Sequence, residues 1–238
     1  MARSGDAAAG FGNRLLAALP EVDRQRLLTH LEPLEMTVRQ PVYAPGEPIE
    51  HVYFPDGCVL SVLAVMDDGQ AIEVATVGNE GMVGVPVLLG VATSQELAFC
   101  QVPGRARRMP AETFRELAND AGAVQALLQR YTYAYFSQLS QGSACNRVHS
   151  VDQRCARWLL MTHDRVGGRD HFELTQQFLA QMLGVRRATV TQAAGRLARA
   201  GLITYHRGVI TIVDRTGLEA AACECYRIIT DEHARLIG

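Results

Sequence analysis

The spacing of apolar residues changes along the chain from helical to strand-like and back. Residues 14–31 carry leucines at helical spacing and predict a helix that breaks near Pro20. Residues 35–103 contain short β-rich runs between turn residues, which is typical of an antiparallel sandwich or barrel. Pro110 then opens a helical region with a short helix predicted at 113–118. The first half of the chain is therefore predicted to be a β-sheet domain flanked by helices.

A long helix is predicted next, over residues 123–148. Its apolar residues recur at steps of three and four, the spacing of a coiled-coil seam, so we expect this helix to pair two copies of the chain. The predicted seam consists of Val124, Leu127, Leu128, Tyr131, Tyr135 and Leu139. Packing of the same stripe on the chain's own β domain is the alternative. Another helix is predicted over 151–165, which makes residues 146–150 the expected hinge.

The stretch 175–199 has the spacing of a helix-turn-helix. The Thr175 hydroxyl can cap a first helix, and Gly184 can adopt the positive φ angle of a sharp turn. A second helix is predicted over 187–199, and Ala180 supplies the small residue needed where the two helices cross. This motif predicts that the second helix enters the major groove of DNA.

A wing is predicted immediately after this motif. Residues 202–205 and 209–213 have the pattern of two short strands joined by a tight turn. The tip would bring His206 and Arg207 close to a phosphate backbone.

The charge of this region favours DNA as the partner. Residues 174–213 contain five arginines and no acidic residue, although the formal net charge of the chain is −2. Only this part of the molecule is therefore expected to bind a polyanion. An ordinary helical bundle with a basic face is the alternative, but it leaves the turn glycine, the wing and the missing acids as separate coincidences.

Composition limits the other classes of function. A chain of 238 residues with 48% hydrophobic and 20% charged residues can form two cores. No apolar run could span a bilayer and residues 1–14 contain no signal-peptide core, so we expect a cytoplasmic protein without a membrane partner. The chain has no phosphate-binding glycine loop, metalloprotease motif or closely spaced histidine pair in the β region. We therefore expect no enzyme, and a metal-dependent enzyme on the barrel is the alternative of that class.

The cysteines show no CxxC spacing. They are Cys58, Cys100, Cys145, Cys155, Cys223 and Cys225. In a cytoplasmic protein most are expected to be small buried apolar residues. Cys223 and Cys225 could bind a metal or respond to oxidation if His206, His233 or a partner chain completed the ligand set. Residues two apart on a helix point in different directions, so a structural role is favoured and no metal site is predicted.

The order of these parts resembles the cyclic-AMP receptor and fumarate-nitrate regulator (Crp/Fnr) superfamily of bacterial transcription factors. The most specific stretch is TQQFLAQMLGVRRATVTQAAGRLARAGLI at 175–203, which resembles the family's winged helix-turn-helix without gaps. VYFPDG and VGNEGMVG resemble strands and a loop of its barrel. The resemblance implies an α+β fold with an N-terminal antiparallel β-barrel or jelly roll of the cyclic-nucleotide-binding type, a long dimerisation helix and a C-terminal winged helix-turn-helix. The expected boundaries are 14–122, 123–149 and 150–238.

The resemblance also implies a function. Members are homodimers that bind palindromic promoter sites on double-stranded DNA and regulate transcription, so we expect DNA, a second copy of the chain and RNA polymerase as partners. An architectural protein that binds DNA without sequence preference is the alternative.

DNA contacts can be assigned from the resemblance residue by residue. Well-known members read bases with an Arg, the Glu that follows it and a second Arg; Arg187, Ala188 and Gln192 stand at these places. Arg187 could pair with guanine and Gln192 with adenine, so the operator should differ from that of those members. Arg186 at the cap position is expected to contact phosphate. The complete set of expected contacts is Thr175, Gln176, Gln177, Arg186, Arg187, Ala188, Thr189, Thr191, Gln192, Arg196, His206 and Arg207.

The barrel departs from nucleotide-binding members. Val85 stands where they have a Glu for the ribose, and Gln95 stands near the place of the Arg that binds phosphate. A cyclic nucleotide would lack its counter-charge, so cyclic AMP is not expected. The candidate effector pocket consists of Gly81, Gly84, Val85, Gln95, Leu139 and Ser140.

Other effectors have little positive support in the sequence. The first cysteine is Cys58, so the N-terminal cysteine cluster of oxygen-sensing members is absent and no iron-sulfur cluster is expected. Cyclic di-GMP, another metabolite, no ligand, or haem all stay open, and the cofactor is left unknown. The candidate haem ligands are His30, His51, His149 and Cys100.

Overall fold

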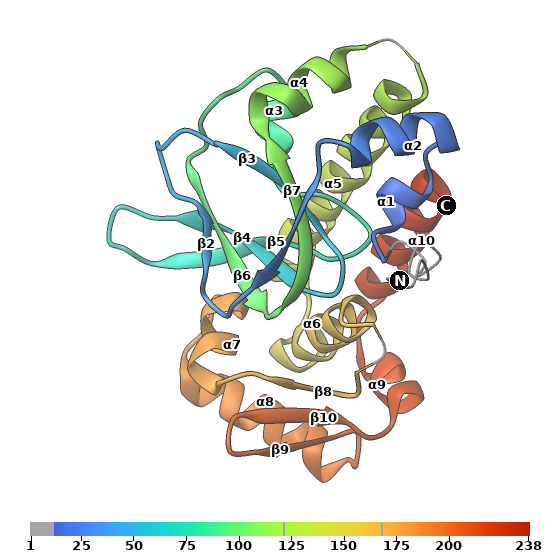
Figure 1. The fold of residues 1–238 in the computed structure, drawn as a ribbon. Helices are drawn as coiled ribbons and strands as arrows, with labels where there is room; N and C mark the ends of the chain where they lie inside the picture. Colours follow the sequence, from blue (N-terminus) through green and yellow to red (C-terminus); the bar gives the residue numbers. More distant parts are fainter. Residues whose placement is uncertain (1–11, 121, 168) are drawn as a thin grey trace, which may run out of the picture.

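Two antiparallel sheets face each other in the N-terminal half of the computed structural model, which describes residues 12–120, 122–167 and 169–238 (Figure 1). One sheet has the order β1 (Glu32–Met36), β7 (Gly104–Pro110) and β3 (His51–Pro55). The other has the order β2 (Pro41–Tyr43), β6 (Glu96–Val102), β4 (Val59–Val65) and β5 (Ala71–Val77). The sheet sandwich predicted for this region is confirmed. The segment without a signal-peptide core, residues 1–14, lies largely outside the described residues.

The long apolar run of β4 has a structural reason, because this strand contributes to two cores. Leu60 and Val62 point into the core between the sheets. Val59 and Leu63 pack with the C-terminal part of the chain in a second core. A strand buried on both faces needs a continuous run of apolar residues instead of an alternating pattern. The C-terminal domain is thus packed on the outer face of this sheet.

Helices cover the ends and one side of the sandwich. They are α1 (Arg14–Ala17), α2 (Glu21–Leu28), α3 (Val85–Leu88), α4 (Ala111–Asn119) and α5 (Ala123–Val148). Pro20 separates α1 from α2, as predicted. The Asn13 side chain caps α1 and also donates to the Pro55 and Gly81 carbonyls, which fixes the N-terminal helix on the sheets.

The C-terminal part is a winged helix-turn-helix followed by two further helices. Its elements are α6 (Val151–Arg165), β8 (His171–Glu173), α7 (Gln176–Leu183), α8 (Arg187–Arg199), β9 (Ile203–His206), β10 (Val209–Ile212), α9 (Arg215–Ala221) and α10 (Cys225–Ile237). The wing is a sheet of order β8-β10-β9. A capping box of Ser150 and Gln153 starts α6 directly after α5 ends, at the predicted hinge.

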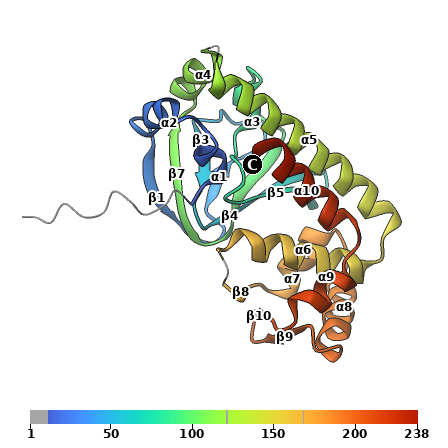
Figure 2. The ribbon, with the colours of Figure 1, turned by 90° about the vertical axis from the view of Figure 1, so that its right-hand side faces the viewer.

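The expected α+β architecture is confirmed, but several elements were not predicted. These are α3, β7, β8, α9 and α10. Of these, α10 matters most for the arrangement of the two halves, because it runs beside α5 along the sandwich (Figure 2). Ile237 at its end enters the core between the sheets, and the Arg130 side chain donates to the Leu236 carbonyl at 2.9 Å. The C-terminus is therefore packed on the N-terminal sandwich.

The predicted dimer seam on α5 is wrong for most of its members. Val124, Leu127, Leu128 and Tyr131 are buried in the chain's own core, because α5 closes one side of the sandwich. The Tyr131 hydroxyl donates to the Met82 carbonyl at 2.6 Å and accepts from the Met82 amide at 3.0 Å. Helical spacing identifies an apolar face but does not say what covers it.

The rest of the stripe is only partly buried. Tyr135 and Leu139 pack at the edge of the same core. The large apolar residues that α5 turns to solvent are Tyr133, Phe136 and Val148, which are 57%, 63% and 69% exposed. Within the described residues, no helix is long and apolar enough to cross a bilayer.

Candidate DNA-binding surface and sensor cavity

The turn between α7 and α8 is built from local contacts. The Thr175 hydroxyl accepts from the Phe178 amide at 3.1 Å and so caps α7. Gly184 ends α7 with φ 62°, a left-handed conformation in which a Cβ would be strained. The Val185 amide donates to the Ala180 carbonyl at 3.0 Å, and Ala180 itself is buried between the helices. These contacts hold α8 at the angle that a helix-turn-helix requires.

The outer side of α8 carries the predicted base-reading residues. Arg187, Ala188, Thr191 and Gln192 are all exposed, whereas Thr189 is half-buried. The Thr191 hydroxyl donates to the Gln176 side-chain oxygen at 2.7 Å. This bond joins the start of α7 to the exposed face of α8, so these predicted residues form one continuous surface. Arg186 and Gln177 are exposed beside it.

Arg196 has a partner that the sequence did not indicate. Its guanidinium pairs with both carboxylate oxygens of Asp152, at 2.5 and 2.6 Å. The hydrogen bond from Arg196 lowers the pKa of the Asp152 carboxyl. Arg196 was expected to contact DNA, but in this conformation it ties α8 to the start of α6. Asp152 lies upstream of the acid-free stretch, so charge counting along the chain could not reveal the pair.

The wing ends in a turn that presents Arg207. His206 closes β9 opposite Val209, and the two residues between them have positive φ angles, 49° at Arg207 and 82° at Gly208. Two consecutive left-handed residues are the signature of a tight two-residue hairpin. Arg207 is exposed, and an arginine in this conformation is strained. His206 is exposed beside it.

The predicted effector pocket corresponds to a cavity of about 220 Å³ between the second sheet and α5. Gly84, Val85 and Leu139 line it. Gln95 and Ser140 are exposed and lie outside the lining. Gly81 is also outside it, and a Cβ at this position would clash with the Tyr131 ring. The structure therefore brings together only part of the predicted set.

The lining of this cavity is apolar and acidic. Glu96 lines it in place of the neighbouring Gln95, and its carboxylate accepts from the Ser94 hydroxyl. Burial, with Glu96 acting in the same direction, raises the pKa of Tyr43, another lining residue. None of the described lining residues is basic. The other lining residues are Val62, Val74, Val77, Met82, Val83, Pro86, Leu89, Thr132, Tyr135 and Phe136.

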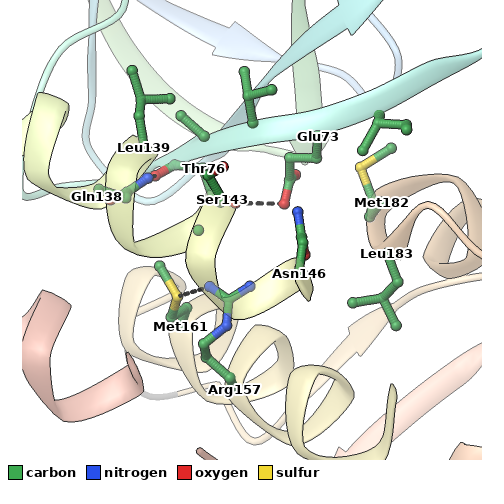
Figure 3. Close-up of a pocket in the computed structure, with 14 residues that line it drawn as sticks. Glu73, Thr76, Gln138, Leu139, Ser143, Asn146, Arg157, Met161, Met182 and Leu183 are labelled. Atoms are coloured by element: carbon green, nitrogen blue, oxygen red, sulfur yellow. Dashed lines mark hydrogen bonds between the residues drawn. The ribbon is translucent and has the colours of Figure 1, made fainter. Parts of the chain in front are cut away.

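Glu73, labelled beside a cavity in Figure 3, is half-buried, and its carboxyl group joins the sandwich to the DNA-binding domain. Glu73 of β5 accepts from the Trp158 indole nitrogen of α6 at 2.7 Å. It also accepts from the Thr76 hydroxyl at 2.8 Å and lies 2.7 Å from the Ser61 hydroxyl. Burial raises the pKa of Glu73, and its hydrogen bonds with Ser61, Thr76 and Trp158 act against that shift. Nearby, a cavity of about 180 Å³ separates β5, α5 and α6, with Arg157 on its wall.

A buried ion pair forms a second link between the two halves. Arg165 at the end of α6 lies 2.7 Å from Glu80, in the loop after β5, and both side chains are buried. Burial alone would raise the pKa of Glu80, but the adjacent Arg165 lowers it overall. The ring of His233 is buried beside this pair, and neither of its nitrogens has a hydrogen-bond partner among the described residues. The sequence predicted none of these contacts.

Comparison with known proteins identifies the DNA-binding domain and the fold. Residues 153–221, from α6 to α9, match the model of the Crp-like helix-turn-helix domain. Solved transcriptional regulators share the fold over 79–81% of this chain. The chain therefore contains a Crp-like helix-turn-helix domain and shares the fold of solved Crp/Fnr regulators. No curated protein sequence matches the chain significantly.

Three solved structures illustrate the shared Crp/Fnr fold. FixK2 from Bradyrhizobium japonicum is 16% identical with a TM-score of 0.65, over 81% of this chain and 98% of that one. A transcriptional regulator of the CRP family from Thermus thermophilus is 18% identical with a TM-score of 0.64, over 79% and 96%. The c-di-GMP responsive global regulator CLP from Xanthomonas campestris is 18% identical with a TM-score of 0.58, over 81% and 99%. At these identities the likeness concerns the fold.

Proposed function

We propose that this Crp/Fnr-type protein is a sequence-specific transcriptional regulator that binds palindromic promoter sites as a homodimer and acts on RNA polymerase. The observation that carries the proposal is the exposed face of α8, where Arg187 and Gln192 stand next to a wing tipped by Arg207. Residues 14–122 would form the sensor, 123–149 the dimerisation helix and hinge, and 150–238 the DNA-binding domain.

The exposed residues divide by the part of DNA that they would contact. Arg187 has the fork of donors that matches guanine in the major groove, and Gln192 can bond to adenine in both directions. Ala188 can meet a thymine methyl group. Arg186 and Arg207 would bind phosphates, which position the protein without specifying sequence.

Selection of binding sites from randomised DNA tests this division. Arg187→Ala should relax the preference at one base position per half-site, a loss of about 1–3 kcal/mol of discrimination. Arg207→Ala should weaken binding to all sequences alike and reduce the slope of log affinity against log salt by about 1. Arg115→Ala, an exposed arginine on α4 away from this surface, is the matched control. Equal loss of affinity on every sequence for both variants would support an architectural DNA-binding protein instead.

The dimer contact is proposed to lie on the solvent side of α5. Tyr133 and Phe136 are one helical turn apart there, and both expose more than half of their side chains. Phe136→Arg should convert the dimer to a monomer in light scattering and weaken binding to a palindromic site. Val22→Arg changes an even more exposed apolar residue on α2 and should leave the dimer intact. A fully dimeric Phe136→Arg variant would refute this interface.

The sensor is proposed to respond to a ligand other than cyclic AMP. A cyclic phosphate in the cavity would meet Glu96 and a set of lining residues without a positive charge. Phe136 lines this cavity and also reaches the proposed dimer face, so a bound ligand would touch the dimer contact directly. Calorimetry with cyclic AMP and cyclic di-GMP, beside mass spectrometry of molecules that copurify with the protein, tests the proposal. Saturable binding of cyclic AMP in this cavity would refute it.

A further inference from the structure

Four potential metal ligands converge where α5 ends and α10 begins. Cys145 and His149 are one helical turn apart at the end of α5. Cys223 lies in the connection after α9, and Cys225 is the first residue of α10. Their sulfur and nitrogen atoms all lie within 4.8 Å of one another. The three cysteines are buried and form a small cluster of their own.

The separations in this cluster are those of ligands around a single ion. The Cys145 and Cys223 sulfurs are 3.5 Å apart, and the Cys225 sulfur lies 3.6 Å from Nδ1 of His149. In a tetrahedral zinc site the metal–sulfur distance is about 2.3 Å and the metal–nitrogen distance about 2.0–2.1 Å, which places neighbouring ligand atoms roughly 3.5–3.8 Å apart. Both separations lie close to this range, and the remaining ligand atoms lie within 4.8 Å of one another, so small side-chain rotations would complete the shell.

The surroundings also orient the ligands. Nε2 of His149 lies 3.2 Å from a carboxylate oxygen of Glu224, so Glu224 can hold a proton on Nε2 and leave Nδ1 free to coordinate. Such a carboxylate behind a histidine ligand is the usual outer contact of a zinc site. The Gln141 side chain donates to the Cys225 sulfur at 3.0 Å.

The charges near the cluster suit a thiolate-rich site. Three thiolates and a neutral imidazole around a dication carry one net negative charge. The Nε atoms of Arg154 and Arg157 are buried and have no hydrogen-bond partner among the described residues. The two guanidinium groups therefore provide the compensating positive field.

We propose that Cys145, His149, Cys223 and Cys225 form a tetrahedral zinc site that fastens the hinge end of α5 to the start of α10. Soft thiolates with one imidazole select zinc over magnesium or calcium. Four protein ligands leave no open position, so the ion has a structural role instead of a catalytic one. His149 is followed directly by Ser150, the cap of α6, and the ion therefore fixes the hinge between the sensor and the DNA-binding domain.

The sequence alone favoured a structural role for Cys223 and Cys225, because residues two apart on one helix diverge. That reasoning does not apply, since only Cys225 belongs to α10 and Cys223 precedes it. The completing ligands are Cys145 and His149 instead of His206 or His233.

Metal analysis of the full-length protein, purified without chelators, tests the site. We expect one zinc ion per chain, and X-ray absorption should show three sulfurs at about 2.3 Å and one nitrogen at about 2.0–2.1 Å. Exchange with Co²⁺ should give the intense visible absorption of a tetrahedral thiolate complex. These readouts need no variant and do not depend on DNA binding.

Variants then locate the ion. Cys223→Ala and His149→Ala should each lower zinc retention against a chromogenic chelator at least tenfold, whereas Cys155→Ala, a buried cysteine outside the cluster, should retain the wild-type affinity. If the ligand variants fail to fold, the absorption spectra of the wild-type protein decide. A folded wild-type protein that takes up no zinc, a shell of oxygen and nitrogen only, or a Cys145–Cys223 disulfide in the native protein would each overturn the proposal.

Discussion

Glu73 is the group whose replacement tests most directly how the two halves of the protein are joined. The Ser61 hydroxyl lies 2.7 Å from one Glu73 oxygen and 2.6 Å from the Gln101 side-chain oxygen, yet it has a single hydrogen to donate. Two arrangements satisfy these contacts: a protonated Glu73 that donates to Ser61 while Ser61 donates to Gln101, or a Gln101 amide turned over so that its nitrogen donates to Ser61. We propose the first. The raised pKa of Glu73, caused by burial, agrees with this assignment.

The structure predicts different losses of folding stability for two substitutions of Glu73. Glu73→Ala removes the acceptor of the Trp158 indole and of the Thr76 hydroxyl, for which no other acceptor lies among the described residues. Each buried donor left without a partner costs about 1–3 kcal/mol, so the loss of stability should be roughly 2–6 kcal/mol. Glu73→Gln keeps the oxygen that accepts both bonds, and its amide can donate to Ser61. Its effect should stay within about 1 kcal/mol.

Urea unfolding as a function of pH measures both quantities. Since the pKa of Glu73 is raised on folding, the folded state binds the proton more tightly and wild-type stability should fall as pH rises from the unfolded pKa through the folded one. Glu73→Gln should lack this decline. Equal destabilisation by Gln and Ala, or the same pH profile in wild type and Glu73→Gln, would show that Glu73 is ionised and that the assignment is wrong.

Three further substitutions test separate features. Arg207→Gly and Arg207→Ala should lose the same DNA affinity, but only Gly relieves the left-handed strain and should be about 1 kcal/mol more stable in thermal unfolding. Asp152→Asn releases Arg196 for contact with phosphate, so the slope of log DNA affinity against log salt should become steeper by about 1. An unchanged slope would mean that Arg196 does not contact DNA. Burial lowers the pKa of His233, although Glu80 and Glu232 act in the opposite direction, so the wild-type protein should lose stability as the pH falls below about 6.5. His233→Leu should not show this loss, and an unchanged dependence of stability on pH in this range would contradict the reasoning.

The sequence was most informative where the structure depends on local spacing. The Thr175 cap and the Gly184 turn lie where predicted, because capping and left-handed turns depend on single residues. The short strand β8 was missed, since three residues give too little pattern to distinguish a strand from a loop.

Contacts between distant segments could not be predicted in this way. The stripe on α5 was recognised, but its partner turned out to be the chain's own sheets. The Cys145–Cys223 contact and the Glu73–Trp158 bond join residues that are 78 and 85 positions apart. Nothing in local periodicity relates such positions, so these parts of the site required the structure.

The position of α5 explains how one ligand could influence DNA binding in the proposed regulator. Tyr135 and Phe136 line the sensor cavity, and Phe136 also faces the proposed dimer partner. His149 lies 13 residues further along, which is about 20 Å on a continuous helix, at the hinge to the DNA-binding domain. A ligand that binds one placement of this helix more tightly must shift the hinge toward the corresponding arrangement. By thermodynamic linkage, operator DNA must change the affinity for the ligand by the same factor by which the ligand changes the affinity for DNA. A ligand that altered DNA affinity without this reverse effect would exclude coupling through α5.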